Sequence, residues 1–90
     1  MGVIEKLKIE NDLGLHARAA AKIVELVGQY GSSLFFKKGG REVDGSSILS
    51  ILTLSCPKGT NIEVRIEGED SGELLKALKQ LFQDKFGEDK

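Results

Sequence analysis

The sequence is poor in cysteine, in excess charge of either sign and in long apolar runs, and each shortage excludes a class of protein. The one cysteine, Cys56, excludes an internal disulfide and a site built from several thiolates, which fits a reducing compartment. Thirteen basic residues face 14 acidic ones, so the general attraction to nucleic-acid phosphates is missing and no nucleic acid is expected as a partner. The longest apolar run, residues 47–54, is too short to cross a bilayer, and no membrane insertion is expected.

The length and the N-terminal segment set further limits. Residues 1–15 contain no basic segment followed by an apolar stretch and a cleavage site, so we expect a cytoplasmic protein. The 90 residues predict a single domain, residues 1–90, that buries roughly 60 to 65% of its extended surface in one pair of layers. We expect a monomer with no large enclosed cleft. No cluster of metal ligands and no pair of carboxylates stands out, so neither a metal nor another cofactor is expected.

Hydrophobic periodicity predicts four strands and three helices. In chain order these are a strand at 3–9, a helix at 17–30, strands at 34–37 and 41–43 joined at Gly39-Gly40, a helix at 48–54, a strand at 62–67 and a helix at 71–86. Residues 87–90 are expected to fray. Because each strand has one apolar face, the order β-α-β-β-α-β-α predicts an α+β fold: a four-stranded antiparallel sheet with three helices on one face.

The only histidine, His16, stands where a loop meets the helix expected from Ala17. If His16 caps that helix, the free N–H groups of Ala17, Arg18 and Ala19 attract an anion to the space beside the imidazole. Arg18 adds a guanidinium group whose donors suit phosphate oxygens. His16 could then take a phosphoryl group and the helix start could hold it, whereas an ordinary exposed cap residue is the alternative interpretation.

Two motifs together resemble the HPr family, the histidine phosphocarriers of the bacterial phosphoenolpyruvate-dependent phosphotransferase system. They are Gly14-Leu15-His16-Ala17-Arg18 before an alanine-rich helix, and Ser46-Ser47-Ile48-Leu49 opening a short apolar helix about thirty residues later. The resemblance covers essentially the whole chain and implies an open-faced β-sandwich. It also implies that His16 accepts a phosphoryl group on Nδ1 from phosphorylated enzyme I and passes it to an EIIA-type domain. Arg18 would neutralise the phosphoryl oxygens, and the protein would be a regenerated carrier rather than an independent enzyme.

One residue departs from the family pattern. Many members have proline three residues after the histidine, and this chain has Ala19. Alanine restores an N–H donor in the first helical turn, so the change does not argue against an anion site. Similar sequences occur in regulatory, nitrogen-linked phosphorelays as well as in sugar uptake, so both branches stay open.

The resemblance also assigns roles to the second helix. It aligns Ser47 with a regulatory serine that HPr kinase/phosphorylase phosphorylates, although Ser46 and Ser47 could be simple helix caps and the register is open by one residue. The five apolar residues that follow cannot all face the core of so short a helix. The family alignment places Ile51 and Leu54 in the core and Ile48 and Leu49 in a docking patch. Leu52 stands where the family commonly has a polar residue, so we expect it to widen this patch. Helix packing that hides all of them is the alternative.

Two other functions remain as hypotheses. The first is a regulatory binding module that docks its Ile48 and Leu49 patch onto a kinase or transcription factor under control of Ser47 phosphorylation. The second is a small ACT-like or ferredoxin-like ligand-binding domain. Cys56 is expected as a buried apolar residue rather than a redox group. Solvated surface is expected for the acidic residues Glu10, Asp12, Glu67, Glu69 and Asp70.

Overall fold

A computed structural model describes residues 2–88 of the chain. The elements are β1 (Gly2–Lys8), α1 (Ala17–Val27), β2 (Ser33–Lys38), β3 (Arg41–Asp44), α2 (Ile48–Leu52), β4 (Asn61–Glu67), α3 (Ser71–Gln83) and a 3-10 turn, η1 (Lys85–Gly87). The predicted α+β class and element order are confirmed, with η1 as an addition. None of the helices in this part of the chain is long and apolar enough to cross a membrane.

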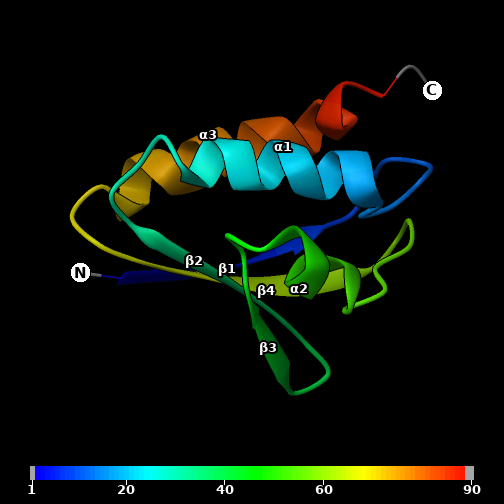
Figure 1. The fold of residues 1–90 in the computed structure, drawn as a ribbon, viewed down its shortest axis with the longest axis horizontal. Coiled ribbons are helices and arrows are strands. Elements are labelled where there is room, and N and C mark those ends of the chain that lie inside the picture. Colours follow the sequence, from blue (N-terminus) through cyan, green and yellow to red (C-terminus); the bar gives the residue numbers. More distant parts are fainter. Residues whose placement is uncertain (1, 89–90) are drawn as a thin grey trace.

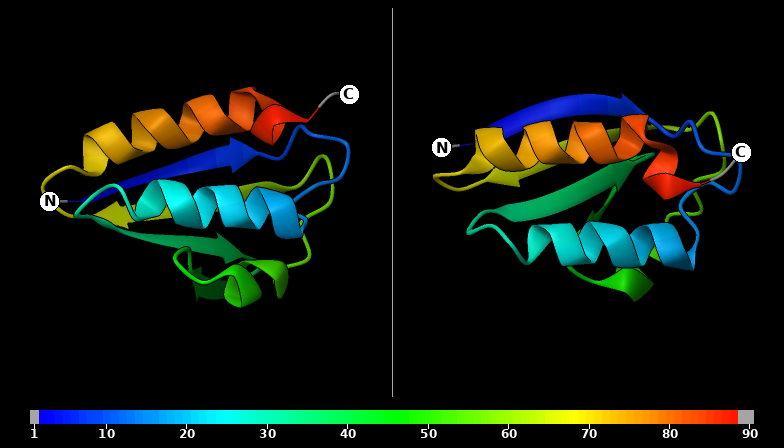
Figure 2. Two further views of the ribbon diagram at one scale, coloured as in Figure 1. Left: turned by 45° about the horizontal axis from the view of Figure 1, so that its top comes forward. Right: turned by 90° about the horizontal axis from the view of Figure 1, so that it is seen from above.

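The four strands form one antiparallel sheet in the order β1-β4-β2-β3. Helices α1 and α3 lie side by side over one face of it (Figure 1). Helix α3 packs against β1 and β4, and α2 packs beside α1 and β3, so that the helices follow one another across the sheet as α3, α1, α2 (Figure 2). Within residues 2–88, the opposite face of the sheet carries no helix, which confirms the predicted open-faced arrangement.

The core forms between the sheet and the helices because the apolar residues repeat at the period of their element. In β2, Leu34 and Phe36 are buried while Phe35 is only half-buried, as the alternation predicts. Burying one such side chain stabilises the fold by about 1.5 to 3 kcal/mol. The largest fully buried apolar side chains are Ile9, Ile23, Leu34, Phe36, Ile51, Ile62, Val64, Ile66, Leu74 and Leu78.

The glycine pair between β2 and β3 forms the predicted hairpin turn. Gly39 and Gly40 have φ angles of 58° and 83°, in the left-handed region that glycine adopts without steric cost. Lys38 then pairs with Arg41 in the antiparallel register. The turn signal in the sequence is confirmed.

The predicted ends of two helices are wrong. Helix α1 ends at Val27 instead of residue 30. Gly28 is its C-cap, and the N–H groups of Gln29 and Tyr30 then bond to carbonyls only three residues back, so the chain leaves the α-helical pattern. Helix α2 ends at Leu52 instead of Leu54, although Leu54 is buried as expected. The chain cannot continue as a helix here, since Ser55 has a φ angle of 54° and the next residue precedes a proline.

The C-terminal segment also differs from the prediction of a helix to residue 86 followed by fraying. Helix α3 ends at Gln83, and the chain then turns back so that Phe86 is buried with its ring 5.0 Å from that of Phe82, measured between centroids. The fraying prediction is wrong for Gly87 and Glu88, which follow Phe86 toward the body of the protein. Residues 89–90 lie outside the described residues.

One acidic residue expected on the solvated surface joins two loops instead. Asp70 Oδ2 accepts a hydrogen bond of 2.8 Å from the N–H of Gly31, and its Oδ1 accepts one from the hydroxyl of Ser32. These bonds, with the Ser32 hydroxyl foremost, hold the pKa of Asp70 below its ordinary value of 3.8. Asp70 therefore ties the loop after α1 to the start of α3.

We expect Gly14→Ala to destabilise the protein more than Gly39→Ala does. Both glycines have positive φ angles, so alanine at either position costs about 1 to 2 kcal/mol of backbone strain. Around Gly39 nothing lies within 4 Å of an added Cβ, whereas at Gly14 that atom would lie 2.4 Å from the Cys56 carbonyl oxygen. We expect a loss of about 3 kcal/mol or more in the free energy of unfolding for Gly14→Ala, measured by urea denaturation. Equal losses in the two variants would contradict this.

The Asp70 contacts predict a pH-dependent stability. Because the folded-state pKa is depressed, the stabilisation is fully present above the unfolded-state value of 3.8 and is lost as the pH falls through the folded-state pKa. Asp70→Asn is therefore expected to lower the free energy of unfolding at neutral pH. At about pH 3 the same substitution should lower it by a smaller amount. Urea denaturation at both pH values measures this, with Glu69→Gln as the neighbouring control. A deficit independent of pH would refute the assignment.

Candidate functional site

His16 caps α1, as the sequence predicts. Its backbone is extended, with φ −81° and ψ 179°, and its ring nitrogen Nδ1 accepts a hydrogen bond of 3.0 Å from the N–H of Ala19. The expectation that the Ala19 N–H is free is therefore wrong: the cap itself uses it. Within residues 2–88, no hydrogen bond engages the N–H groups of Ala17 and Arg18, which face the same end of the helix.

A tight turn before the histidine sets its position. Gly14 has a φ angle of 70°, and its carbonyl oxygen accepts hydrogen bonds from the N–H of His16 at 2.9 Å and from Asn11 Nδ2 at 2.7 Å. The next residue, Leu15, is buried and donates its N–H to the carbonyl of Cys56 at 2.9 Å. The loop is thus held from both sides, which fixes the backbone position from which the imidazole extends.

The structure does not bring Arg18 into contact with His16. Arg18 is exposed at the second position of α1, and no hydrogen bond or ion pair of its side chain occurs within residues 2–88. Its long side chain starts one helical position after the N–H of Ala17, so its guanidinium can reach the space in front of the helix end.

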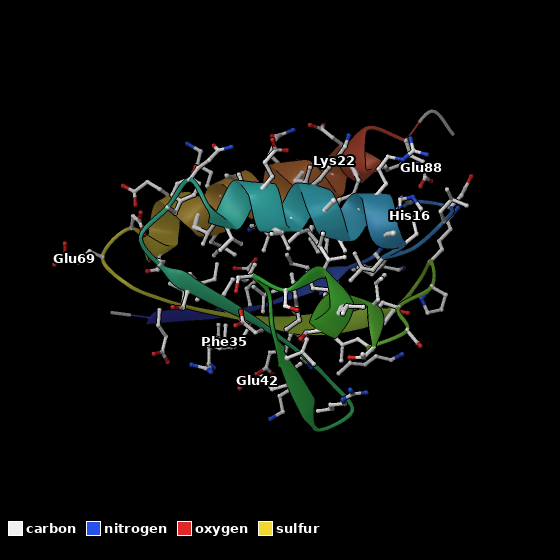
Figure 3. The ribbon with its side chains drawn as sticks, viewed as in Figure 1. His16, Lys22, Phe35, Glu42, Glu69 and Glu88 are labelled. Carbon is white, nitrogen blue, oxygen red and sulfur yellow. The ribbon has the colours of Figure 1, made fainter. Side chains whose placement is uncertain are left out.

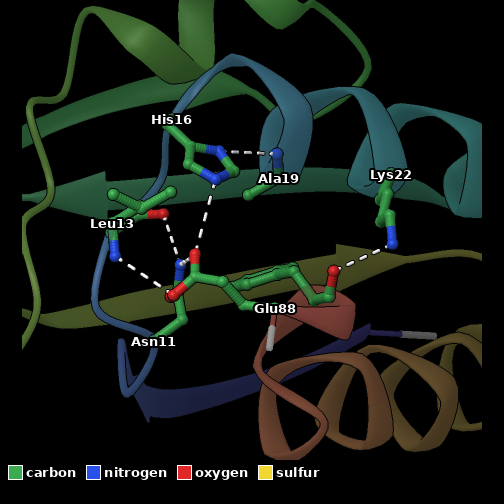
Figure 4. Close-up of polar contacts among 8 residues, drawn as sticks. Asn11, Leu13, His16, Ala19, Lys22 and Glu88 are labelled. Carbon is green, nitrogen blue, oxygen red and sulfur yellow. Dashed lines mark hydrogen bonds and ion pairs between the residues drawn. The ribbon is translucent and has the colours of Figure 1, made fainter. Parts of the chain in front are cut away.

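Glu88 is a site residue that the sequence analysis missed. Its Oε2 lies 3.4 Å from His16 Nε2, and the two side chains are 11% and 25% exposed. The same carboxylate accepts hydrogen bonds from Asn11 Nδ2 at 3.0 Å and from the N–H of Leu13 at 3.2 Å (Figure 4). The spacing of four residues between Phe82 and Phe86 is the one sequence signal that could have indicated an ordered C-terminal turn.

The environment of Glu88 keeps it ionised. The hydrogen bond from Asn11 is the main cause that lowers the pKa of the Glu88 carboxyl, and the backbone N–H groups of Leu13 and Asp12 and the nearby His16 act in the same direction. Partial burial opposes them. Figure 3 shows His16, Lys22 and Glu88 together at one end of the molecule, with Glu69 at the other.

Ser47, rather than Ser46, is the residue that caps α2. Its Oγ accepts a hydrogen bond of 3.2 Å from the N–H of Ser50. Ser46 instead donates its hydroxyl to Asp44 Oδ1 at 2.7 Å. Ser47 is half-buried and directly precedes the exposed apolar residues of α2.

The apolar residues of α2 divide between core and surface. Ile51 and Leu54 are buried, as expected, while Ile48 and Leu49 are 38% and 77% exposed. The interpretation that helix packing hides all of these residues is wrong. Leu52 is half-buried and packs against the core, so the exposed patch consists mainly of Ile48 and Leu49.

Cys56 is buried, in agreement with the expectation of a small apolar residue. Burial raises the pKa of its thiol, and the charge of Lys38 opposes this. A protonated, inaccessible thiol is a poor nucleophile. In the part of the chain that the structure describes, no three side chains of His, Cys, Asp or Glu gather in a geometry suited to a metal ion.

Known proteins are similar to this chain in both sequence and fold. Residues 3–84 match the family described as PTS HPr component phosphorylation site. The chain is 43% identical over 84 residues to the phosphocarrier protein HPr of Xylella fastidiosa (strain Temecula1), covering 93% of this chain and 94% of that protein. It is 36% identical over 90 residues to the phosphocarrier protein NPr of Escherichia coli (strain K12), covering 99% and 100%.

A solved structure agrees over nearly the full length. HPr-C-His from Thermoanaerobacter tengcongensis superimposes with a TM-score of 0.92 at 34% identity, covering 98% of this chain and 99% of that one. Together these matches overturn the alternative of an ACT-like or ferredoxin-like ligand-binding domain. The chain belongs to the HPr family of phosphocarrier proteins of the phosphotransferase system.

Proposed function

We propose that this phosphocarrier accepts a phosphoryl group on Nδ1 of His16 from phosphorylated enzyme I and donates it to an EIIA-type domain. The observation that carries the proposal is the capping geometry of His16, whose Nδ1 faces the N–H groups at the start of α1. A phosphoryl group on this nitrogen would lie where backbone donors and the helix dipole stabilise an anion. The carrier could serve sugar uptake or the nitrogen-linked branch, in the cytoplasm, and a monomer remains our prediction.

The resting hydrogen bond between Ala19 and His16 has to break in this step. The lone pair of Nδ1 that accepts the N–H of Ala19 is the pair that attacks phosphorus. Once the N–P bond has formed, the released N–H of Ala19 can donate to a phosphoryl oxygen, together with the N–H groups of Ala17 and Arg18. The same donor thus stabilises the resting ring and then the phosphorylated one.

Arg18 supplies the mobile positive charge of the site. Its exposed guanidinium can approach the phosphoryl oxygens from the solvent side, where a donor or acceptor domain also has to approach. Transfer between two proteins needs an in-line arrangement that forms only in their complex, so this chain contributes position and charge rather than an enclosed pocket.

The exposed residues Ile48 and Leu49 are the proposed docking patch for enzyme I and EIIA domains. Helix α2, which carries them, packs beside α1, at whose N-terminus His16 lies. Exposed neighbouring apolar residues on a small domain commonly mark an interface. Leu52 would contribute less than these two, because it already packs against the core.

A second, regulatory function follows from the position of Ser47. Ser47 is the residue before the docking patch, so a phosphate on its Oγ would add a charge of about −1.5 to −2 at the edge of that patch. We propose that an HPr kinase/phosphorylase, where present, could modify Ser47 and so weaken docking. A regulatory binding module of this kind would need the patch but not His16.

His16→Ala is expected to abolish phosphorylation completely. We would incubate the wild type and the variant with phosphoenolpyruvate and enzyme I and record intact masses before and after mild acid. The wild type should gain one acid-labile phosphoryl group, since phosphohistidine is the proposed species, and the variant none. A variant that is still phosphorylated, or a shift in the wild type that survives acid, would contradict the proposal. Partner binding retained by an otherwise inactive variant would favour the regulatory module.

Leu49→Ser is expected to weaken docking without weakening the fold. Leu49 is 77% exposed, so its apolar surface is free for a partner, and burying a leucine contributes about 1.5 to 3 kcal/mol. The kcat/KM of enzyme I for the variant should therefore fall by about tenfold or more. The control is Ile4→Ser in β1, because Ile4 is 64% exposed but lies outside the patch. Equal effects of the two variants would argue against docking through α2.

A further inference from the structure

Two contacts anchor the C-terminal turn and bring Glu88 to the histidine. Phe86 is buried against Phe82, and its carbonyl oxygen accepts a hydrogen bond of 2.8 Å from Lys22 Nζ on α1. Lys85 and Phe86 both adopt left-handed backbone angles, with φ of 54° and 57°. Non-glycine residues hold this conformation only where surrounding contacts enforce it. The turn is therefore a built part of the structure that ends beside α1.

The carboxylate of Glu88 is held by a residue that also shapes the histidine loop. Asn11 is fully buried and uses its Nδ2 twice, donating to the carbonyl of Gly14 at 2.7 Å and to Glu88 Oε2 at 3.0 Å. The N–H of Leu13 occupies the other carboxylate oxygen. Asn11 thus sets the turn before His16 and the position of the Glu88 carboxylate at the same time.

The contacts of the His16 ring specify one tautomer. A backbone N–H can only donate, so the contact of 3.0 Å with Ala19 requires an unprotonated Nδ1. An ionised carboxylate can only accept, so the contact of 3.4 Å with Glu88 places the ring proton on Nε2. The two contacts therefore agree that Nδ1 carries the free electron pair. This nitrogen is the nucleophile that the proposed function needs.

We propose that Glu88 is a positioning residue for phosphoryl transfer at His16: it holds the proton on Nε2 and balances the positive charge that the ring gains. This inference rests on the proposed function. Glu88 touches neither phosphorus nor the donor, and it acts only through the imidazole. The contact of 3.4 Å is longer than a strong hydrogen bond, and such contacts shorten when charge develops on the catalytic group.

The electron count shows why a carboxylate is useful there. The lone pair of Nδ1 forms the new N–P bond, while the bond between phosphorus and the donor atom breaks and leaves its pair on the donor. The proton stays on Nε2 throughout, so the ring changes from neutral to cationic in this step. Glu88, fixed next to Nε2, stabilises that charge where it develops and without rearrangement. In the reverse direction it keeps the imidazole a good leaving group.

The test compares Glu88→Ala with the control Glu69→Ala. The control removes a carboxylate at the opposite end of the molecule (Figure 3). In the unphosphorylated wild type and in Glu69→Ala, 15N-edited NMR should show a His16 Nε2 proton protected from exchange with water. Glu88→Ala should lose that signal, and Glu88→Gln, which keeps the length but not the charge, should weaken it. A proton equally protected in Glu88→Ala would overturn the proposal.

The rate of phosphorylation by enzyme I is the second readout. Removing a carboxylate that orients a functional histidine, in a metal site or a catalytic triad, typically lowers function by about tenfold or more. We therefore expect a fall of at least this size in Glu88→Ala and none in Glu69→Ala. An unchanged rate after loss of the Nε2 signal would show that Glu88 only anchors the C-terminal turn, and would overturn its role in transfer. Because the NMR readout needs no phosphorylation, a failure of the proposed function itself, with no phosphoryl uptake by the wild type, is distinguished from a failure of this inference.

Discussion

The close contact of the Gly14 turn with the segment at Cys56 and Pro57 is the constraint on which the site depends. It leaves no room for a side chain at residue 14 and fixes the path by which the chain enters α1. Because His16 follows two residues later, the turn decides where the imidazole lies. The buried Asn11 extends the same arrangement to the C-terminal turn, so three segments distant in sequence meet around one ring.

Helix capping and the proposed phosphoryl transfer use the same ring nitrogen of His16. The preferred N-cap residues are serine, threonine, aspartate and asparagine. Helix stability alone therefore does not explain a histidine at this position. The ring nitrogen that satisfies the Ala19 N–H is also the proposed nucleophile. In that proposal, the start of α1 is first the hydrogen-bond partner of the resting ring and then the group of donors that holds the phosphoryl group.

The division of α2 follows from its shortness. A helix of five residues can bury only one side, so Ile51 faces the core while Ile48 and Leu49 remain exposed. The exposed apolar surface that results is the docking patch that we propose for partner proteins. Ser47 caps the same helix, so the phosphate that we propose there would place its negative charge at the edge of this surface.

The sequence by itself determined the periodic elements and the start of α1, because these depend on neighbouring residues. The alternation in Ile62, Val64 and Ile66 indicates one buried face of a strand, and a loop followed by alanines after His16 indicates a helix with that residue as its cap. Only the tertiary structure decided how the chain turns after α3, that Asp70 joins two loops and that Glu88 reaches His16. These depend on contacts between residues far apart in the chain, which periodicity does not encode. The spacing of Phe82 and Phe86 indicates at most an ordered turn, and only the burial of Phe86 shows that this turn ends beside His16.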